Sequence, residues 1–499
     1  MNVYDSQVAE GLLKKAGYEI QREHEDDGSV PEAASQKPQG SGAEDNGQRP
    51  DVILMNTCSV REHAEDRVYS RLGMLGKIKR TNPDLIVGLM GCMVEEHKEK
   101  LFKRFPQLDL MVGTRNIKEL AGLIDEVRHT RRQVSRIKQD GLSIEYTELI
   151  NRTSAFHAWL PIMTGCNKVC TFCVVPTTRG SEVSMPAREV YREASRLVSE
   201  GVKCITLLGQ NVNSYGSEEM SKSPRTAPDA PVSGVRENID VVAGPATGVS
   251  SWAPPPGVDP PIRTNSRVTR QDVNFPELLD MLCQIEGLER ISFTTSHPHD
   301  ATEALYRVIA KNLKISRRFH LPLQSGSDRI LKRMKRLHTY QEYKEKIDLM
   351  RKLIPDVAIT TDIIAGFSGE TEEDFEATRR ALEEIRYDSA FIYKYSVRPG
   401  TPAVKLEDDV PLAVKEERHQ KLLQLQKKIM DRNNREWLGK TAAVFVEQAS
   451  DRNPLHLIGR TSQDRKVVFE GGQHQVGTFA RVTLTGLRHE TFIGTLCES

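Results

Sequence analysis

The sequence predicts an α/β protein in three parts: an N-terminal open parallel sheet, a partial (βα)6 barrel and a small C-terminal antiparallel β-barrel. Three observations predict this class. Continuous apolar runs alternate with helical patterns between residues 51 and 113. Six strand-then-helix units follow from about residue 152. Short alternating strands with glycine-rich turns then occupy residues 440–499.

Composition and length agree with a globular protein of several domains. The chain has 499 residues, 38% of them hydrophobic, and a formal net charge of +1. No apolar run reaches the ~18 residues that a membrane span needs, so we expect no membrane association. We expect domains at residues 1–127, 152–435 and 436–499. Residues 22–49 and 217–272 bury too little apolar surface to offset ordering, and are predicted to be disordered insertions without a catalytic role.

The first segment predicts an open parallel sheet with two cysteines at one edge. Residues 51–58, 85–92 and 108–113 are predicted strands, and a helix is expected near 62–80. Cys58 and Cys92 each end a strand. Because ligands of such sheets bind outside the carboxyl ends of the strands, these two thiols are predicted to share a metal site.

The second segment predicts the partial barrel. Its expected strands are 158–165, 203–209, 290–296, 317–323, 357–364 and 389–396. Its expected helices are 186–200, 275–286, 301–312, 328–353 and 371–386, and a further helix at 411–436 leads to the last domain. Sites in this architecture lie at the carboxyl ends of the strands. The loops that begin at Gly209-Gln210 and Gln324-Ser325 are therefore predicted to contact a cofactor at one barrel mouth.

Cys166, Cys170 and Cys173 directly follow the first barrel strand in a C-x3-C-x2-C run. Three thiolates can hold a [4Fe-4S] cluster and leave one iron open to S-adenosyl-L-methionine, whose reductive cleavage starts radical chemistry. Phe172 is predicted to pack beside the adenine of that nucleotide. A structural zinc site would need a fourth ligand, and no second Cys or Cys/His pair follows at the required spacing. A disulfide would leave one cysteine over.

Several motifs together resemble those of the radical-SAM methylthiotransferases, with the MiaB subfamily most similar. They are Met1-Asn-Val-Tyr-Asp-Ser6, Asn56-Thr-Cys-Ser-Val-Arg-Glu62, Cys173-Val-Val-Pro176 with Thr178-Arg-Gly180, Leu208-Gly-Gln-Asn-Val-Asn-Ser-Tyr-Gly216, His320-Leu-Pro-Leu-Gln-Ser-Gly-Ser-Asp328 and Arg398-Pro-Gly-Thr401. The resemblance covers nearly the whole chain outside the insertions, and it identifies the last segment as a TRAM domain. The insertions and the Lys/Arg-rich helices suggest the eukaryotic Cdk5-regulatory-subunit-associated group.

The resemblance implies methylthiolation at C2 of N6-isopentenyladenosine-37 of tRNA. It implies that Cys166, Cys170 and Cys173 hold the radical-generating cluster, and that Cys58 and Cys92 are two ligands of a second [4Fe-4S] cluster, the sulfur donor. The cofactors then perform the chemistry, and no side chain acts as catalytic acid or base. The expected partners are the tRNA anticodon stem-loop and a flavodoxin- or ferredoxin-like electron donor. We expect a monomer in the cytoplasm or the mitochondrion.

The chain departs from the family pattern at its start. The family's first cluster cysteine lies in a Gly-Cys-Gln-Met-Asn string, and this chain begins at the Met-Asn. We therefore expect an N-terminally truncated chain that loads its second cluster poorly. A minor departure is Ser368, where family members usually have Pro.

Three other functions stay open. One is methylthiolation of threonylcarbamoyladenosine-37 or of a ribosomal-protein aspartate. Another is a truncated, non-catalytic regulatory or RNA-binding role, and the third is a structural zinc module. Retention of the three barrel cysteines argues against the non-catalytic role, because a scaffold has no need of them.

Overall fold

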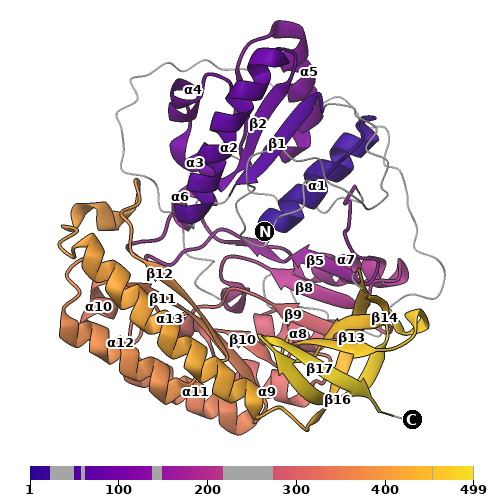
Figure 1. The fold of residues 1–499 in the computed structure, drawn as a ribbon, viewed down its shortest axis with the longest axis vertical. Helices are drawn as coiled ribbons and strands as arrows, with labels where there is room; N and C mark the ends of the chain where they lie inside the picture. The colour runs from indigo at the N-terminus through magenta and orange to yellow at the C-terminus, as the bar shows by residue number, and fades with distance from the viewer. Residues whose placement is uncertain (23–49, 58–61, 138–148, 217–272, 452, 498–499) are drawn as a thin grey trace, which may run out of the picture.

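The structure is a computed structural model that describes residues 1–22, 50–57, 62–137, 149–216, 273–451 and 453–497 (Figure 1). Apart from residue 22, the two predicted insertions lie outside these ranges, and so does Cys58.

The first folded part, which we call the N-terminal sheet, begins with a helix and continues as four parallel strands. Its elements are α1 (Asn2–Lys15), β1 (Val52–Thr57), α2 (Glu62–Thr81), β2 (Ile86–Gly91), α3 (Cys92–His97), α4 (Lys100–Arg104), β3 (Leu110–Val112), α5 (Leu120–Thr130) and β4 (Val134–Arg136). The strand order is β1-β2-β3-β4, and every neighbouring pair is parallel. The three predicted strands are thus confirmed. The fourth was not predicted, because it has three residues of which only Val134 is buried.

Both faces of this sheet are covered, which explains why its strands have continuous apolar sequences. Every residue of β2 is buried. Ile86 and Met90 pack on one side with α1 and α5, while Val87 and Leu89 pack on the other side with α2 and α4. Side chains of a strand point alternately to opposite faces, so a strand buried on both needs apolar residues at every position.

The second part is the barrel. Its elements are β5 (His157–Pro161), β6 (Met163–Thr164), α6 (Val175–Thr178), β7 (Val183–Ser184), α7 (Ala187–Ser199), β8 (Cys204–Leu208), α8 (Phe275–Cys283), β9 (Arg290–Phe293), α9 (Glu303–Lys311), β10 (Arg318–His320), α10 (Asp328–Arg333), α11 (Tyr340–Leu353), β11 (Ala358–Ala365), α12 (Glu372–Ile385), β12 (Ser389–Lys394) and α13 (Leu412–Arg435). The parallel sheets β5-β8-β9 and β10-β11-β12 are joined by a parallel bridge between Ile291 and Ile315. Six strands in chain order therefore form the predicted partial barrel.

One predicted helix is wrong in extent. Residues 328–353 form two helices, α10 and α11, rather than one. Lys335 adopts a left-handed φ of 52°, and the Arg336 amide donates to the Leu331 carbonyl at 2.9 Å, which closes the end of α10. Thr339 then caps α11 in a capping box with Glu342. The helical period continues across this break, so periodicity alone did not reveal it.

The third part, the C-terminal β-barrel, closes on itself. Its strands are β13 (Thr441–Ser450), β14 (Asn453–Arg460), β15 (Lys466–Glu470), β16 (Phe479–Arg488) and β17 (Thr491–Leu496). They lie in the order β13-β14-β15-β17-β16. The pairing is antiparallel as predicted, except between β15 and β17, which run parallel.

The two flanking parts contact opposite ends of the barrel (Figure 1). The C-terminal β-barrel meets residues that precede or begin barrel strands: the Arg317 amide donates to the Ser462 carbonyl at 2.8 Å, and Arg290 Nη1 donates to the Arg460 carbonyl at 3.0 Å. The N-terminal sheet instead packs against Leu208, at the carboxyl end of β8. Loops at the carboxyl ends therefore face the N-terminal sheet.

Candidate active site

Cys166, Cys170 and Cys173 lie in the loop between β6 and α6. The antiparallel pair β6–β7 brackets this loop, and the Cys166 amide donates to the Gly180 carbonyl at 3.1 Å. Gly165 has a φ of 76°, and a Cβ there would lie 2.0 Å from the Ser181 carbonyl oxygen. Only glycine therefore allows the close turn that leads into the first cysteine.

The three cysteines lie near one another; Cys170 is buried, and Cys166 and Cys173 are partly buried. Burial, together with a smaller effect of the neighbouring thiols, raises the pKa of Cys166 to about 12 and that of Cys173 to about 11. Cys170 is 8% exposed. Three thiols held together in this way stay protonated unless a cation compensates the thiolates. The donor set thus fits an iron–sulfur cluster with three protein ligands.

Polar side chains from later loops of the barrel lie at or near Cys170. Arg336 Nη1 donates to Cys170 Sγ at 3.3 Å, and His297 Nε2 lies 4.0 Å from the same sulfur. Asn213 holds His297 in place, since its amide donates to the His297 carbonyl at 3.0 Å and its Oδ1 accepts from the His297 amide at 2.9 Å. The His338 ring lies 6.1 Å from that of His297. The sequence did not predict that these side chains lie near the cysteines, because no local spacing links them, although Asn213 lies in a quoted motif.

The residues predicted to contact the nucleotide lie on the loops expected of them. Phe172 packs edge-on against Phe367, with 6.5 Å between ring centroids. Gly209 closely approaches Met163, whose Cγ would lie 2.4 Å from a Cβ there. The buried Gln210 Oε1 has no hydrogen-bond partner among the described residues. A small residue and an acceptor without a partner are thus available beside the cysteine loop.

Gln324 and Ser325 follow β10. Gln324 has a left-handed φ of 74°, and its amide donates to the Asp362 carbonyl at 2.9 Å. Ser325 is fully buried, with its hydroxyl 3.3 Å from Thr378 Oγ1 on α12. The hydroxyl of Ser325 therefore ties this loop to the helix outside it.

Cys92 is the first residue of α3, directly after β2. It is 6% exposed. Thr57 and Gly91, the residues before Cys58 and Cys92, are partners in the parallel register of β1 and β2. The two predicted ligands thus follow paired positions at one edge of the sheet, although Cys58 itself lies outside the described residues.

Arg179 connects the cysteine loop of the barrel to Cys92. It follows α6 and is 6% exposed, and it donates to Asp5 Oδ2 of α1 at 2.6 Å. Burial opposes the charge of Arg179, but Asp5 and the Cys92 thiol outweigh burial and raise its pKa. A guanidinium from the barrel therefore lies against the cysteine of the N-terminal sheet.

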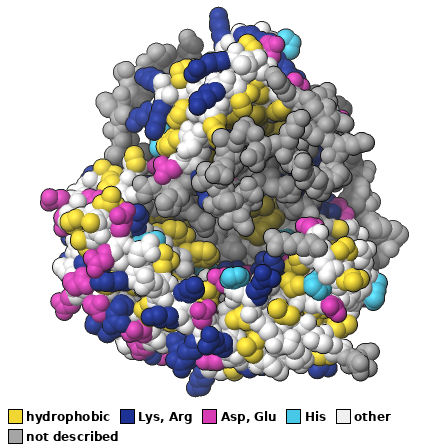
Figure 2. Space-filling view, in the orientation of Figure 1, with side chains coloured by type: hydrophobic (Ala, Val, Ile, Leu, Met, Phe, Trp, Pro, Cys, Tyr) yellow, Lys and Arg dark blue, Asp and Glu magenta, His cyan; other side chains and the backbone are white. Residues whose placement is uncertain are grey.

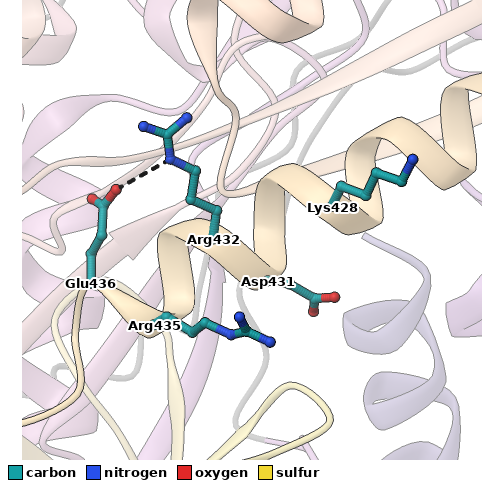
Figure 3. A pocket seen from close by; sticks show the side chains of 5 residues that line it. All are labelled: Lys428, Asp431, Arg432, Arg435 and Glu436. Atoms are coloured by element: carbon teal, nitrogen blue, oxygen red, sulfur yellow. Dashed lines mark ion pairs between the residues drawn. The ribbon is translucent and has the colours of Figure 1, made fainter.

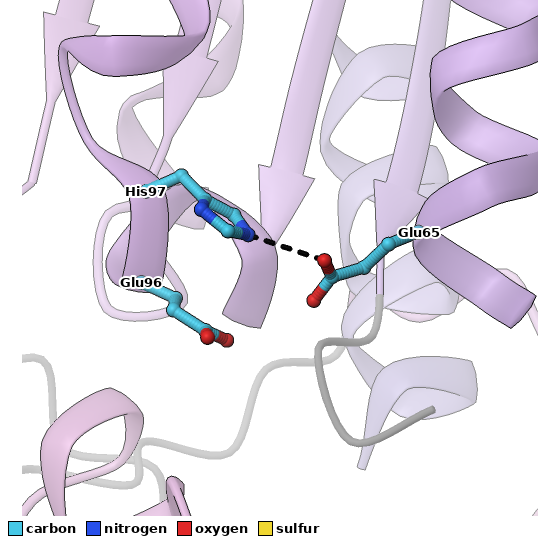
Figure 4. A group of neighbouring side chains, drawn as sticks. All are labelled: Glu65, Glu96 and His97. Carbon is cyan, nitrogen blue, oxygen red and sulfur yellow. Dashed lines mark hydrogen bonds and ion pairs between the residues drawn. The ribbon is translucent and has the colours of Figure 1, made fainter. Parts of the chain in front are cut away.

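A second connection joins Glu65 of α2 to the barrel. Arg398 Nη1 donates to Glu65 Oε1 at 2.8 Å, and His97 Nε2 lies 3.3 Å from Glu65 Oε2 (Figure 4). Glu65, Glu96 and His97 carry the oxygen and nitrogen atoms that could bind a metal ion. Because the guanidinium already neutralises Glu65, we interpret the group as an ion-pair network between the two parts.

A pocket of about 560 Å³ lies along α13, far along the chain from the cysteines. It is lined by Lys428, Asp431, Arg432, Arg435 and Glu436, and Arg432 pairs with Glu436 at 3.8 Å (Figure 3). Figure 2 shows Lys and Arg side chains interleaved with acidic ones over the lower face of the molecule.

None of the helices in the described ranges has an apolar stretch of the length that a membrane span requires.

Known proteins resemble this chain over most of its length. Residues 160–382 match the Radical SAM superfamily, and residues 33–113 match the uncharacterized protein family UPF0004. The tRNA-2-methylthio-N(6)-dimethylallyladenosine synthase of Pelotomaculum thermopropionicum is 38% identical over 500 residues, covering 99% of this chain and 95% of that protein. Its namesake from Dictyoglomus thermophilum is 37% identical over 490 residues, covering 98% and 94%.

Among solved structures, the radical S-adenosylmethionine methyltransferase TsrM from Kitasatospora setae matches with a TM-score of 0.45 and 13% identity. The match covers 72% of this chain and 66% of that one. The expected truncation gains no support from the sequence alignments, since these two relatives are covered to 94% or more.

Proposed function

Because the chain belongs to the radical-SAM methylthiotransferases of the MiaB type, we propose that it adds a methylthio group to C2 of N6-isopentenyladenosine-37 of tRNA. The observation that carries this choice of substrate is the 38% identity, over 99% of the chain, to a protein named for that modification. The wider statement, a tRNA methylthiotransferase with radical-SAM chemistry, follows from membership of the family.

We assign the three-ligand cluster to Cys166, Cys170 and Cys173. When bound, the cluster and S-adenosyl-L-methionine supply the radical that removes hydrogen from an unreactive aromatic carbon. The chain's own residues hold and shield these cofactors. Gly165 lets the loop turn, and Arg336 fixes Cys170. The buried Gln210 Oε1 offers the nucleotide an acceptor.

The remaining nucleotide contacts are assigned to Phe172, Gly209, Gln324 and Ser325. Phe172 offers an apolar face beside the last cysteine, and the close approach at Gly209 leaves room only for backbone. Ser325 contributes through its main chain, because its hydroxyl is engaged by Thr378.

We assign the second cluster, the sulfur donor, to Cys58 and Cys92 with a third ligand in addition. Support comes from the register of β1 and β2, which puts the positions before both cysteines side by side. Iron counting after anaerobic reconstitution tests this assignment. Close to eight irons per chain would mean that both clusters assemble, and close to four would support the expectation that the second loads poorly.

We infer that the tRNA anticodon stem-loop reaches the carboxyl ends of the barrel strands, where the cysteines lie. The target base must leave its stack to enter such a site. The C-terminal β-barrel, the proposed TRAM domain, docks on the other end and would hold another part of the RNA. On α13, exposed cationic side chains such as Arg432 and Arg435 suit RNA phosphates (Figure 3). The flavodoxin- or ferredoxin-like donor, the monomeric state and the compartment stay predictions.

The experiment that tests the substrate is nucleoside mass spectrometry of tRNA from a strain that lacks its own methylthiotransferases and expresses this chain. We expect 2-methylthio-N6-isopentenyladenosine. The thiomethylated threonylcarbamoyl nucleoside in its place would contradict the proposal and favour the alternative substrate. A chain with Cys166, Cys170 and Cys173 changed to Ala serves as the matched control.

A non-catalytic role is tested separately. The purified, reduced protein should cleave S-adenosyl-L-methionine to 5′-deoxyadenosine and methionine. Absence of cleavage by iron-loaded protein would favour the regulatory or RNA-binding role, and zinc without iron would favour a structural module.

A further inference from the structure

Arg336 is held in a fixed direction by the end of α10. Its amide donates to the Leu331 carbonyl at 2.9 Å, and the left-handed Lys335 before it turns the chain back toward the barrel interior. Arg336 is 8% exposed. A buried arginine needs hydrogen-bond acceptors for its N–H groups. The atoms that accept from Arg336 are therefore expected to matter for structure or function.

One of those partners is a cluster cysteine. Nη1 donates to Cys170 Sγ at 3.3 Å, and Nη2 donates to the Pro322 carbonyl at 2.8 Å. Because the guanidinium is planar and rigid, anchoring Nη2 aims Nη1 at the sulfur. Among the residues described, no carboxylate forms an ion pair with Arg336. Its positive charge is therefore directed at the thiol.

The cysteine loop is fastened to the same turn from the other side. The Thr171 amide donates to the Met334 carbonyl at 3.0 Å, and Thr171 Oγ1 donates to the Arg333 carbonyl at 3.1 Å. Both members of the Arg336–Cys170 pair are thus fixed by neighbouring residues. The contact is built into the fold rather than made by a mobile surface side chain.

We propose that Arg336 is a positioning residue that holds Cys170 and raises the reduction potential of the barrel cluster through an N–H···S hydrogen bond from a cation. This rests on the proposed function only in assigning a cluster to the three cysteines. Reduction by a low-potential one-electron donor adds one negative charge to the cluster. Hydrogen bonds to the sulfurs and nearby positive charge stabilise that reduced form.

The test is the potential of the barrel cluster in the full chain, with Cys58 and Cys92 changed to Ala so that only one cluster contributes. Dithionite titrations followed by electron paramagnetic resonance are run on this parent and on R336Q and R336K. R336Q removes the charge, whereas R336K keeps it without the planar donor. R333Q is the matched control, because Arg333 lies three residues away and its Nε donates to the Ser368 carbonyl at 3.0 Å.

We expect R336Q to shift the potential to a more negative value, R336K to shift it less, and R333Q to leave it unchanged. If R336Q loses iron while remaining folded, retention of iron at a lowered potential in R336K supports the proposal. Equal potentials in the parent and both Arg336 variants, at equal iron content, overturn it. A parent that binds no iron contradicts the proposed function as well, so the two failures are distinguishable.

Discussion

The two proposed cysteine sites are built in different ways. The barrel site takes its three thiols from one loop of eight residues, Cys166–Cys173, bracketed by β6 and β7. The N-terminal site draws on the ends of two strands, with Cys92 on α3 and Cys58 beyond β1. The spacing of the three barrel thiols is set within one loop, whereas the N-terminal site depends on how the sheet packs with its neighbours.

This difference shows where the two sites depend on each other. Arg179, which follows the cysteine loop of the barrel, contacts Asp5 and Cys92 of the N-terminal sheet. Arg398 of the barrel forms an ion pair with Glu65 of the N-terminal sheet. Both connections lie at the carboxyl ends of the barrel strands. We infer that the barrel site can form without the N-terminal site, while the N-terminal site needs the barrel to complete its surroundings.

The largest expected effect is loss of the radical reaction when the barrel thiols are removed. Changing Cys166, Cys170 and Cys173 to Ala should abolish 5′-deoxyadenosine formation, because no other group in the proposed site can hold the open cluster. The readout is chromatography of the reaction under reducing conditions. Changing Cys283 to Ala is the control, since that buried cysteine lies on α8 outside the loop. Cleavage that survives the triple change would refute the assignment.

The second prediction separates the two sites. Changing Cys58 and Cys92 to Ala should leave S-adenosyl-L-methionine cleavage within about twofold while methylthiolated tRNA disappears, because only the proposed sulfur donor is lost. Iron content and nucleoside mass spectrometry give the two readouts. Simultaneous loss of cleavage would show that the barrel site cannot form without the N-terminal site.

The third prediction concerns the ion pair that joins the sites. Arg179→Met leaves the carboxylate of Asp5, whose side chain is 7% exposed, buried without its partner. Loss of one member of a buried pair costs roughly 3–5 kcal/mol of unfolding free energy. Urea denaturation should show this loss, and adding Asp5→Leu should recover much of it.

Arg188→Met, on the exposed face of α7, is the matched control for Arg179→Met and should change stability little. If the Arg179 and Arg188 variants denature alike, the connection between the sites contributes no stability.

The sequence predicted those features that depend on local spacing. The cysteine loop, the six barrel strands and the neighbouring carboxyl ends of β1 and β2 follow from short periodic patterns. Contacts between distant segments could not be predicted. Arg336 meets Cys170 across 166 residues, and Arg179 meets Asp5 across 174. Arg179 lies in the Thr178-Arg-Gly180 motif quoted from the sequence, but the partners of both arginines depend on tertiary packing.

The smallest expected effect concerns the amino ends of the barrel strands, which lie away from both proposed cysteine sites. His157 begins β5, and its Nε2 lies 2.9 Å from Thr206 Oγ1. Burial lowers the pKa of His157 to about 4, against an opposing effect of Asp464. The unfolded chain, with a pKa near 6.5, therefore binds more protons between about pH 6.5 and 4. Stability from the neutral ring is complete above that window and is lost as pH falls through it.

His157→Gln should remove this dependence, which amounts to at most about 1.4 kcal/mol per pH unit. Thr206→Val is the matched control: it removes the hydroxyl partner, lowers stability by about 1 kcal/mol at every pH and keeps the slope. Urea midpoints measured from pH 7 to pH 5 give the comparison. Equal slopes in the parent and His157→Gln would mean that this histidine is not held neutral. Because the ring lies at the amino end of β5, acid should weaken this end while the cysteine loop at the other end keeps its contacts with Arg336.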